Sequence, residues 1–173
     1  MKLPFLAGLL ALVPALAGAE VKSATPDSLL IEYRYTVAAP ASKVWDTLLH
    51  PERWWPADHT WSGKRENLSL SADVGGCFCE RWDGNAVEHG RVVMVMPQKM
   101  LRLEAALGPL QEMAISGVIT FALAEKDGAT TLLVTHRVSG DPSQKLDAIA
   151  PVVDQVNALQ FGNAAAAAAA AKP

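Results

Sequence analysis

The sequence of 173 residues predicts an α+β fold in which a curved antiparallel sheet of about six to seven strands wraps around one long C-terminal helix. Apolar and polar side chains alternate in most segments between residues 29 and 138, as in strands with one buried face. Turn signals such as Asp83-Gly84 and Lys126-Asp127-Gly128 separate these segments, so sequential strands should pair. After residue 142 the apolar spacing becomes helical, which supplies one helix to cover the sheet.

The predicted elements follow one another with short connections. The first strand covers residues 29–37, and a short helix over residues 42–49 follows it and ends before Pro51. An irregular loop rich in Trp and Pro covers residues 51–64. The remaining predicted strands cover residues 68–72, 77–82, 87–96, 100–107, 115–124 and 130–138. One face of the last helix carries Ile149, Val152, Val153, Val156 and Leu159.

The N-terminal residues have the pattern of a secretory signal peptide. Lys2 precedes an apolar stretch over residues 3–16, and Ala17-Gly18-Ala19 is a small-residue cleavage pattern. We therefore expect cleavage after Ala19, a secreted or periplasmic protein, and no membrane span in the mature chain. The single domain should cover residues 20–163. An Ala-rich tail over residues 164–173 either extends the last helix or frays.

The composition bounds the class of protein. Half of the residues are apolar and 19% are charged, which is typical of a globular domain. The formal net charge is −3 and no basic run occurs, which argues against nucleic acid as a partner. The sequence does not determine the oligomeric state.

Several motifs together resemble one superfamily. The sequences AAPASKVWDTL at residues 38–48 and HPERWW at residues 50–55 are similar to the opening of the SRPBCC (START/Bet v 1-like) superfamily. The sequence GGCFCE at residues 75–80, and GRVV at residues 90–93 followed by Pro97 and Leu101, resemble the branch of heat-shock protein 90 ATPase activator homologues. The resemblance, over residues 29–159, implies a helix-grip fold with a deep apolar cavity between sheet and helix. It also implies members that bind lipids, steroids or polyketides, and a few that are cyclases or dehydratases.

Candidate site residues come from the Trp-rich loop and the strand over residues 77–82. Trp54, Trp55 and Trp61 lie in the loop, where they either cap a cavity or pack on the end of the sheet. Met side chains suit a cavity of loose specificity or simply fill a core. The residues predicted to bind a ligand are Trp54, Trp55, Trp61, Phe78, Glu80, Trp82, Arg91, Met94, Met113 and His136.

Glu80 is the candidate for chemistry. It shares one strand face with Phe78, so an inward orientation would require a charged partner or a raised pKa. Arg91, His89 and His136 lie on neighbouring predicted strands, and Glu80 with either histidine could form an acid/base pair. Alternatively, Glu80 faces solvent or is ion-paired at the rim, and the histidines are structural.

Neither a metal nor another cofactor is expected. His59, His89 and His136, with Asp58, lack the short spacing that metal ligands have and lie on three separate elements.

The two cysteines leave two alternatives open. Cys77 and Cys79 are two residues apart on a predicted strand, where the Cβ atoms of a regular strand are too far apart for a disulfide. They are either free buried thiols or a disulfide that requires a bulge or kink in the strand.

Three functions follow. The first is an exported protein that binds a hydrophobic small molecule, lipid-, steroid- or polyketide-like, in the cavity between sheet and helix. The second is a cyclase- or dehydratase-type enzyme that uses Glu80 with a histidine in the same cavity. The third is a protein-interaction module related to the chaperone activators. The sequence leans toward binding rather than catalysis, and the contact between Glu80 and a histidine discriminates between the first two.

Overall fold

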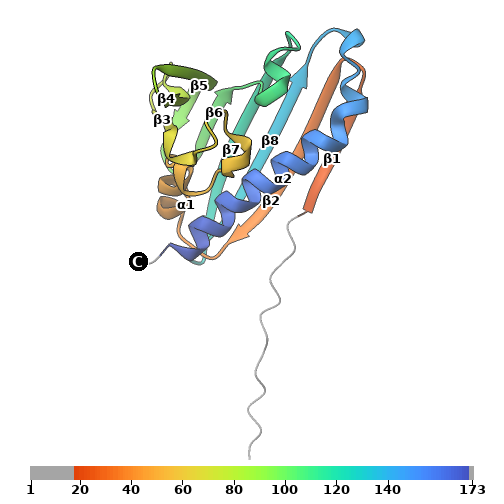
Figure 1. Ribbon diagram of the computed structural model, residues 1–173. Helices are drawn as coiled ribbons and strands as arrows, with labels where there is room; N and C mark the ends of the chain where they lie inside the picture. The colour runs from red at the N-terminus through yellow and green to blue at the C-terminus, as the bar shows by residue number, and fades with distance from the viewer. Residues whose placement is uncertain (1–17, 172–173) are drawn as a thin grey trace, which may run out of the picture.

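The computed structural model describes residues 18–171 as one antiparallel sheet and two α-helices (Figure 1). The strand order is β1-β2-β8-β7-β6-β5-β4-β3. The strands are β1 (Gly18–Thr25), β2 (Ser28–Val37), β3 (Leu68–Leu70), β4 (Cys77–Trp82), β5 (Asn85–Met96), β6 (Met100–Glu104), β7 (Ser116–Lys126) and β8 (Ala129–Ser139). The helices are α1 (Ala41–Leu48) and α2 (Leu146–Ala170).

The predicted fold class is confirmed, with one strand more than expected. The additional strand, β1, pairs with β2 at the edge of the sheet. It carries few large apolar residues, and Val21 is 38% exposed. The buried side chains at this edge of the sheet belong to β2. Its first two residues precede the predicted cleavage site, and the rest of the predicted signal peptide, residues 1–17, lies outside the described residues.

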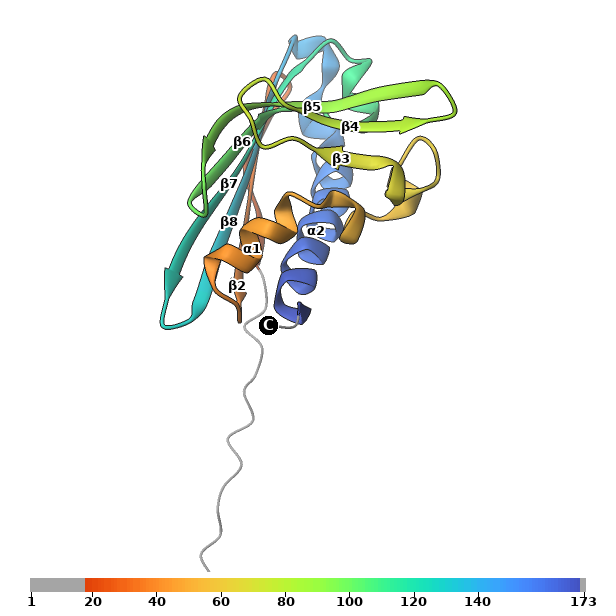
Figure 2. The same ribbon diagram turned by 90° about the vertical axis from the view of Figure 1, so that its left-hand side faces the viewer.

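The sheet is curved, and both helices lie on the same side of it (Figure 2). Helix α2 runs mainly along β2 and β1, and the end of the sheet formed by β3, β4 and β5 curls toward the helix side. On β8, alternate residues from Thr130 to Val138 are buried, as the two-residue period predicts. The inner face of the sheet is therefore covered by α2 on one half and by the loop after α1 on the other.

Helix α2 continues through Gly162 and Asn163 into the alanine segment. Ala164 and Ala168 are buried, and this end of the helix contacts α1. Alanine has the highest helix propensity, and its small side chain permits close packing. The domain boundary predicted at residue 163 therefore falls inside a helix. None of the helices within residues 18–171 is both long and apolar enough to cross a membrane.

Cys77 and Cys79 form a disulfide across two residues of β4. Their Cα atoms are 5.3 Å apart, which is shorter than the roughly 6.7 Å of a regular strand. The opposite strand is bulged at the same place, because Phe78 pairs with Gly90 whereas Cys79 pairs with Glu88. Of the two alternatives left by the sequence, the structure therefore has the disulfide. The shift in pairing between β4 and β5 leaves His89 as the extra residue of β5.

Candidate functional site

A cavity of about 480 Å³ lies between α2 and the loops beside the curled end of the sheet. Its walls come from α2, from the loop over residues 55–61, from the segment 107–113 and from His89 on β5. The volume is within the range of cavities that hold small organic ligands. The architecture thus leaves a ligand-sized space beside α2, but between the helix and two loops rather than between the helix and the inner face of the sheet, where the resemblance predicts it.

The α2 wall changes from apolar to polar along the helix. Ile149, Val153 and Val156 give the cavity an apolar surface. Asn157 and Gln160 follow them toward the C-terminus of the helix. Asn157 and Gln160 are only 2% and 3% exposed, so their amides lie at the buried end. The side-chain oxygen of Gln160, Oε1, accepts no hydrogen bond among the described residues. An unpartnered buried acceptor is costly unless something else donates to it.

The facing wall is aromatic and aliphatic. Trp55 is buried, and its Nε1 donates to the carbonyl of His59 at 2.9 Å, which fixes the ring against its own loop. Trp61 is 52% exposed and lines the cavity from the outside. Leu110 and Met113 complete this wall from the segment 107–113.

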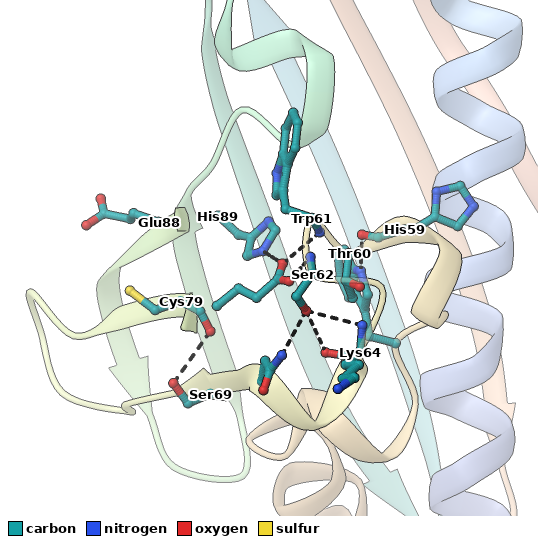
Figure 3. A network of polar contacts seen from close by, with 12 residues as sticks. His59, Thr60, Trp61, Ser62, Lys64, Ser69, Cys79, Glu88 and His89 are labelled. Atoms are coloured by element: carbon teal, nitrogen blue, oxygen red, sulfur yellow. Dashed lines mark hydrogen bonds and ion pairs between the residues drawn. The ribbon is translucent and has the colours of Figure 1, made fainter. Parts of the chain in front are cut away.

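Glu80 is fully buried and accepts hydrogen bonds from three donors on two other elements. The residues that donate, Trp61, Ser62 and His89, are labelled in Figure 3. The backbone amide of Trp61 donates to Oε2 at 3.0 Å, and that of Ser62 donates to Oε1 at 2.5 Å. The Nε2 atom of His89 lies 3.0 Å from Oε2. Of the two orientations that the sequence left open for Glu80, the structure has the inward one, and its partner is His89.

These contacts decide the charge of both groups. Burial alone would raise the pKa of Glu80, but the hydrogen bonds from Ser62, Trp61 and His89 outweigh it and hold that pKa below its ordinary value. Burial lowers the pKa of His89, and Glu80 opposes this shift only in part. The structure consequently favours an ionised carboxylate beside a neutral imidazole.

Aromatic rings hold the imidazole of His89 in place. The centroid of the Phe78 ring lies 5.0 Å from that of His89, and the centroid of Trp55 lies 6.2 Å from it. Trp55 and Phe78 in turn pack edge to face, with centroids 5.1 Å apart. His89 is thus fixed by a carboxylate at one edge and by rings around it.

His136, the other histidine considered for the acid/base pair, is separate from Glu80. It is buried on β8, and its Nδ1 accepts a hydrogen bond from Asn157 Nδ2 at 2.7 Å. Burial lowers its pKa to about 4, so the ring is neutral at pH 7. His136 therefore positions the amide of a cavity residue and joins α2 to the sheet.

The structure divides the predicted ligand-binding residues into three groups. Trp55, Trp61 and Met113 line the cavity. Trp54, Phe78, Glu80 and His136 lie behind its walls; the first two line a separate apolar hollow of about 20 Å³, too small for a ligand. Trp82, Arg91 and Met94 are not among the lining residues.

Arg91 illustrates why the third group lies elsewhere. It follows the bulge at His89, its side chain is 52% exposed, and it binds Glu88 at 2.5 Å and the carbonyl of Gly75 at 3.2 Å. The bulge changes which residues of β5 face inward, and a strict two-residue period cannot predict that change.

The sequence analysis missed Asn157 and Gln160 as site residues. Both lie beside the apolar stripe predicted for the last helix, and a buried amide next to such a stripe was the available signal. Within residues 18–171, no group of three or more His, Cys, Asp or Glu side chains is placed to hold a metal ion.

Comparisons with known proteins agree with the fold. The family model described as Activator of Hsp90 ATPase homolog 1-like protein matches residues 38–156. No curated protein matches the chain. A solved structure from Rhizobium leguminosarum, a putative uncharacterized protein, is 17% identical with a TM-score of 0.59, over 89% of this chain and 98% of that one. A protein from Mesorhizobium loti is 19% identical with a TM-score of 0.55, over 80% of this chain and 95% of that one.

A third similar structure is a two-domain protein. It is the di-domain ARO/CYC StfQ from the steffimycin biosynthetic pathway, 15% identical with a TM-score of 0.58. The match covers 84% of this chain and 50% of that chain, so the present chain corresponds to about half of StfQ. At these identities the likeness establishes the fold alone.

Replacing Glu80 by Ala should destabilise the protein strongly. Two backbone amides and the His89 imidazole would lose their acceptor inside the protein, so we expect the free energy of unfolding to fall by about 3–5 kcal/mol. Urea unfolding followed by Trp fluorescence measures this. The control is Glu88→Ala on β5, an exposed carboxylate paired with Arg91, which should change the free energy by less than about 1 kcal/mol. Equal effects of the two variants would contradict the anchoring role of Glu80.

His136 should make stability depend on pH. Its folded pKa of about 4 lies below its ordinary value of 6.5, so the unfolded chain takes up the proton first as the pH falls. Its contribution is present at pH 7 and is lost as the pH falls from 6.5 toward 4, amounting to about 2 kcal/mol between pH 7 and pH 5. Urea unfolding of His136→Gln should therefore show a smaller loss between these pH values than the unaltered protein.

A variant of the same strand controls for core damage. Val134→Ala, also buried on β8, should lower the free energy of unfolding by a similar amount at pH 7 and pH 5. An unchanged pH dependence in His136→Gln would show that His136 does not carry the effect.

Proposed function

The chain belongs to the family of Activator of Hsp90 ATPase homolog 1-like proteins, and we propose that it binds a hydrophobic small molecule in the cavity between α2 and the loops at residues 55–61 and 107–113. The observation that carries this proposal is the cavity of about 480 Å³, with largely apolar walls and buried amides at one end. Burial of apolar ligand surface would supply the affinity, and the polar groups would fix the ligand's orientation. The size and lining suit a lipid-, steroid- or polyketide-like molecule.

A second candidate function is a cyclase- or dehydratase-type reaction in the same cavity. The observation that favours it is the contact of 3.0 Å between Glu80 Oε2 and His89 Nε2, with His89 lining the cavity. A carboxylate that orients an imidazole is a recurrent arrangement for proton transfer. The fold that the chain shares with StfQ is compatible with this activity, but the binding proposal requires fewer assumptions.

Filling the cavity should abolish binding. Val156 lines the cavity, and Val156→Trp would occupy space that a ligand needs. We expect the affinity for the apolar fluorescent probe N-phenyl-1-naphthylamine to fall at least about ten-fold, or 1.4 kcal/mol. The measurement is a fluorescence titration of the probe.

The matched control places the same side chain outside the cavity. Val74 is 74% exposed in the connection between β3 and β4, so Val74→Trp should leave the affinity within about two-fold. Unaltered binding by Val156→Trp, or equal losses in both variants, would contradict a site in this cavity.

We also propose that the protein is exported, which the N-terminal pattern of residues 1–19 supports. Expression of the full sequence in a bacterium should give a periplasmic product whose intact mass corresponds to a chain beginning at Glu20. Ala19→Arg should block this cleavage, because the processing site requires small residues. An uncleaved product in the cytoplasmic fraction would contradict the proposal.

A further inference from the structure

We propose that the cavity selects ligands that carry an acidic hydroxyl group, a phenol or an enol, on an apolar ring system, and that Nδ1 of His89 accepts the proton of that hydroxyl. This inference rests on the proposed binding function and specifies the chemical class of its ligand. It follows from the hydrogen-bonding capacity of two buried side chains, Glu80 and His89.

The contacts of Glu80 determine the tautomer of His89. The carboxylate receives the amide protons of Trp61 and Ser62, and an ionised carboxylate can only accept hydrogen bonds. The Nε2 atom of His89 must then be the donor in the 3.0 Å contact with Oε2. In a neutral imidazole the other nitrogen, Nδ1, therefore has a free lone pair.

The lone pair of Nδ1 belongs to a residue of the cavity lining, and Nδ1 makes no hydrogen bond to any described residue. The fully enclosed, unpartnered side-chain atoms within residues 18–171 are His136 Nε2 and Gln160 Oε1, so Nδ1 of His89 keeps some accessible surface. The ring cannot easily turn away, because Glu80 holds one edge and Phe78 and Trp55 pack around it. An unpaired acceptor in a fixed orientation favours a ligand that donates a hydrogen bond there.

The lining around His89 is largely apolar, with Trp55, Val153 and Leu110 among the residues that contribute. Gln160 also lines the cavity, but its unpartnered Oε1 is enclosed by the protein and does not take part in recognition of the hydroxyl. A ligand with an apolar body and a hydroxyl donor matches this arrangement, whereas a plain hydrocarbon would leave Nδ1 of His89 without a donor.

Glu80 would also offset part of the cost of moving the ligand's proton to His89. If the ligand O–H bond breaks, the proton forms an N–H bond at Nδ1, and the electron pair stays on the ligand oxygen as a phenolate or enolate. The imidazolium that results keeps its Nε2–H on the ionised Glu80, whose negative charge offsets the new positive charge. No other reactant is required, because the step only moves a proton. Glu80 is in this sense a positioning residue.

The test compares two ligands of nearly equal shape, 2-naphthol and 2-methylnaphthalene. Each displaces N-phenyl-1-naphthylamine from the full protein, and the ratio of the two dissociation constants reports recognition of the hydroxyl. We expect 2-naphthol to bind about ten-fold more tightly than 2-methylnaphthalene. In His89→Phe the ratio should fall to about one, while the affinity for 2-methylnaphthalene stays within about three-fold.

Two further variants distinguish the roles of the residues. Glu80→Gln should also lower the ratio, because a carboxamide does not force His89 to carry its proton on Nε2. If the role of Glu80 were purely structural, the variant would weaken the binding of both probes equally and leave the ratio unchanged. His50→Phe, outside the cavity after α1, is the matched control and should keep the ratio of the unaltered protein. A ratio near one in the unaltered protein, or a preference that persists in His89→Phe, would overturn the inference.

A measurement on the unaltered protein keeps the test decisive if His89→Phe does not fold. The ¹⁵N resonance of His89 Nδ1 should shift when 2-naphthol is added and stay in place with 2-methylnaphthalene; equal behaviour with both probes would overturn the inference. If N-phenyl-1-naphthylamine does not bind, the proposed binding function itself fails; if it binds but 2-naphthol does not displace it, binding stands and the inference about the hydroxyl fails. If both displace it equally, binding stands and the inference about the hydroxyl fails.

Discussion

The site depends on one interaction, the burial of an ionised carboxylate at Glu80. A buried charge is costly unless its hydrogen-bonding positions are filled, and here two backbone amides and an imidazole fill them. The amides belong to the loop over residues 55–61 and its continuation, so the same carboxylate anchors the loop that walls the cavity. The imidazole belongs to the cavity lining. One charge therefore fixes both the loop over residues 55–61, which forms one wall of the cavity, and His89, a polar residue of its lining.

His89 reaches this position because β5 is irregular. A regular strand would place His89 and Gly90 on opposite faces, yet both are buried, because the bulge inserts one residue opposite β4. Gly90 is required beside it, since a Cβ atom there would lie 2.8 Å from the Cβ of Ala105 and 3.0 Å from the carbonyl oxygen of Glu104. On the other strand, the disulfide between Cys77 and Cys79 draws β4 together at the same register. The two irregularities coincide and together set the geometry around Glu80.

The sequence predicted the architecture better than the site. Three sequence patterns were sufficient to predict the sheet and α2: the alternation of apolar residues, the hairpin turns and the change to helical spacing. They sufficed because each pattern depends on local periodicity and burial. They also placed Phe78 and Glu80 on one face of their strand, but they did not decide whether that face is the inner one. They could not place Arg91 outside, because a bulge reverses the alternation without a distinct sequence signal. Nor could they find the unpartnered amide of Gln160, since that property depends on which segments fold over it, and in the segment 107–113 only Met113 was predicted to bind a ligand.

Helix α2 packs differently along its length. At the C-terminal end, buried alanines such as Ala164 and Ala168 bring the helix close to α1 and the sheet. Phe161 comes next and packs edge to face against Tyr33 and Phe121, which closes the space behind Gln160. Further toward the N-terminus the helix is held by longer contacts, including the hydrogen bond of 2.9 Å from the Tyr33 hydroxyl to Asp154. The N-terminal end of the helix is also packed against the rest of the protein, since Leu146 is fully buried and Ala150 is 3% exposed. The alanine segment, which looks featureless as a sequence, is the part of the chain that permits the close contact with α1 at the other end.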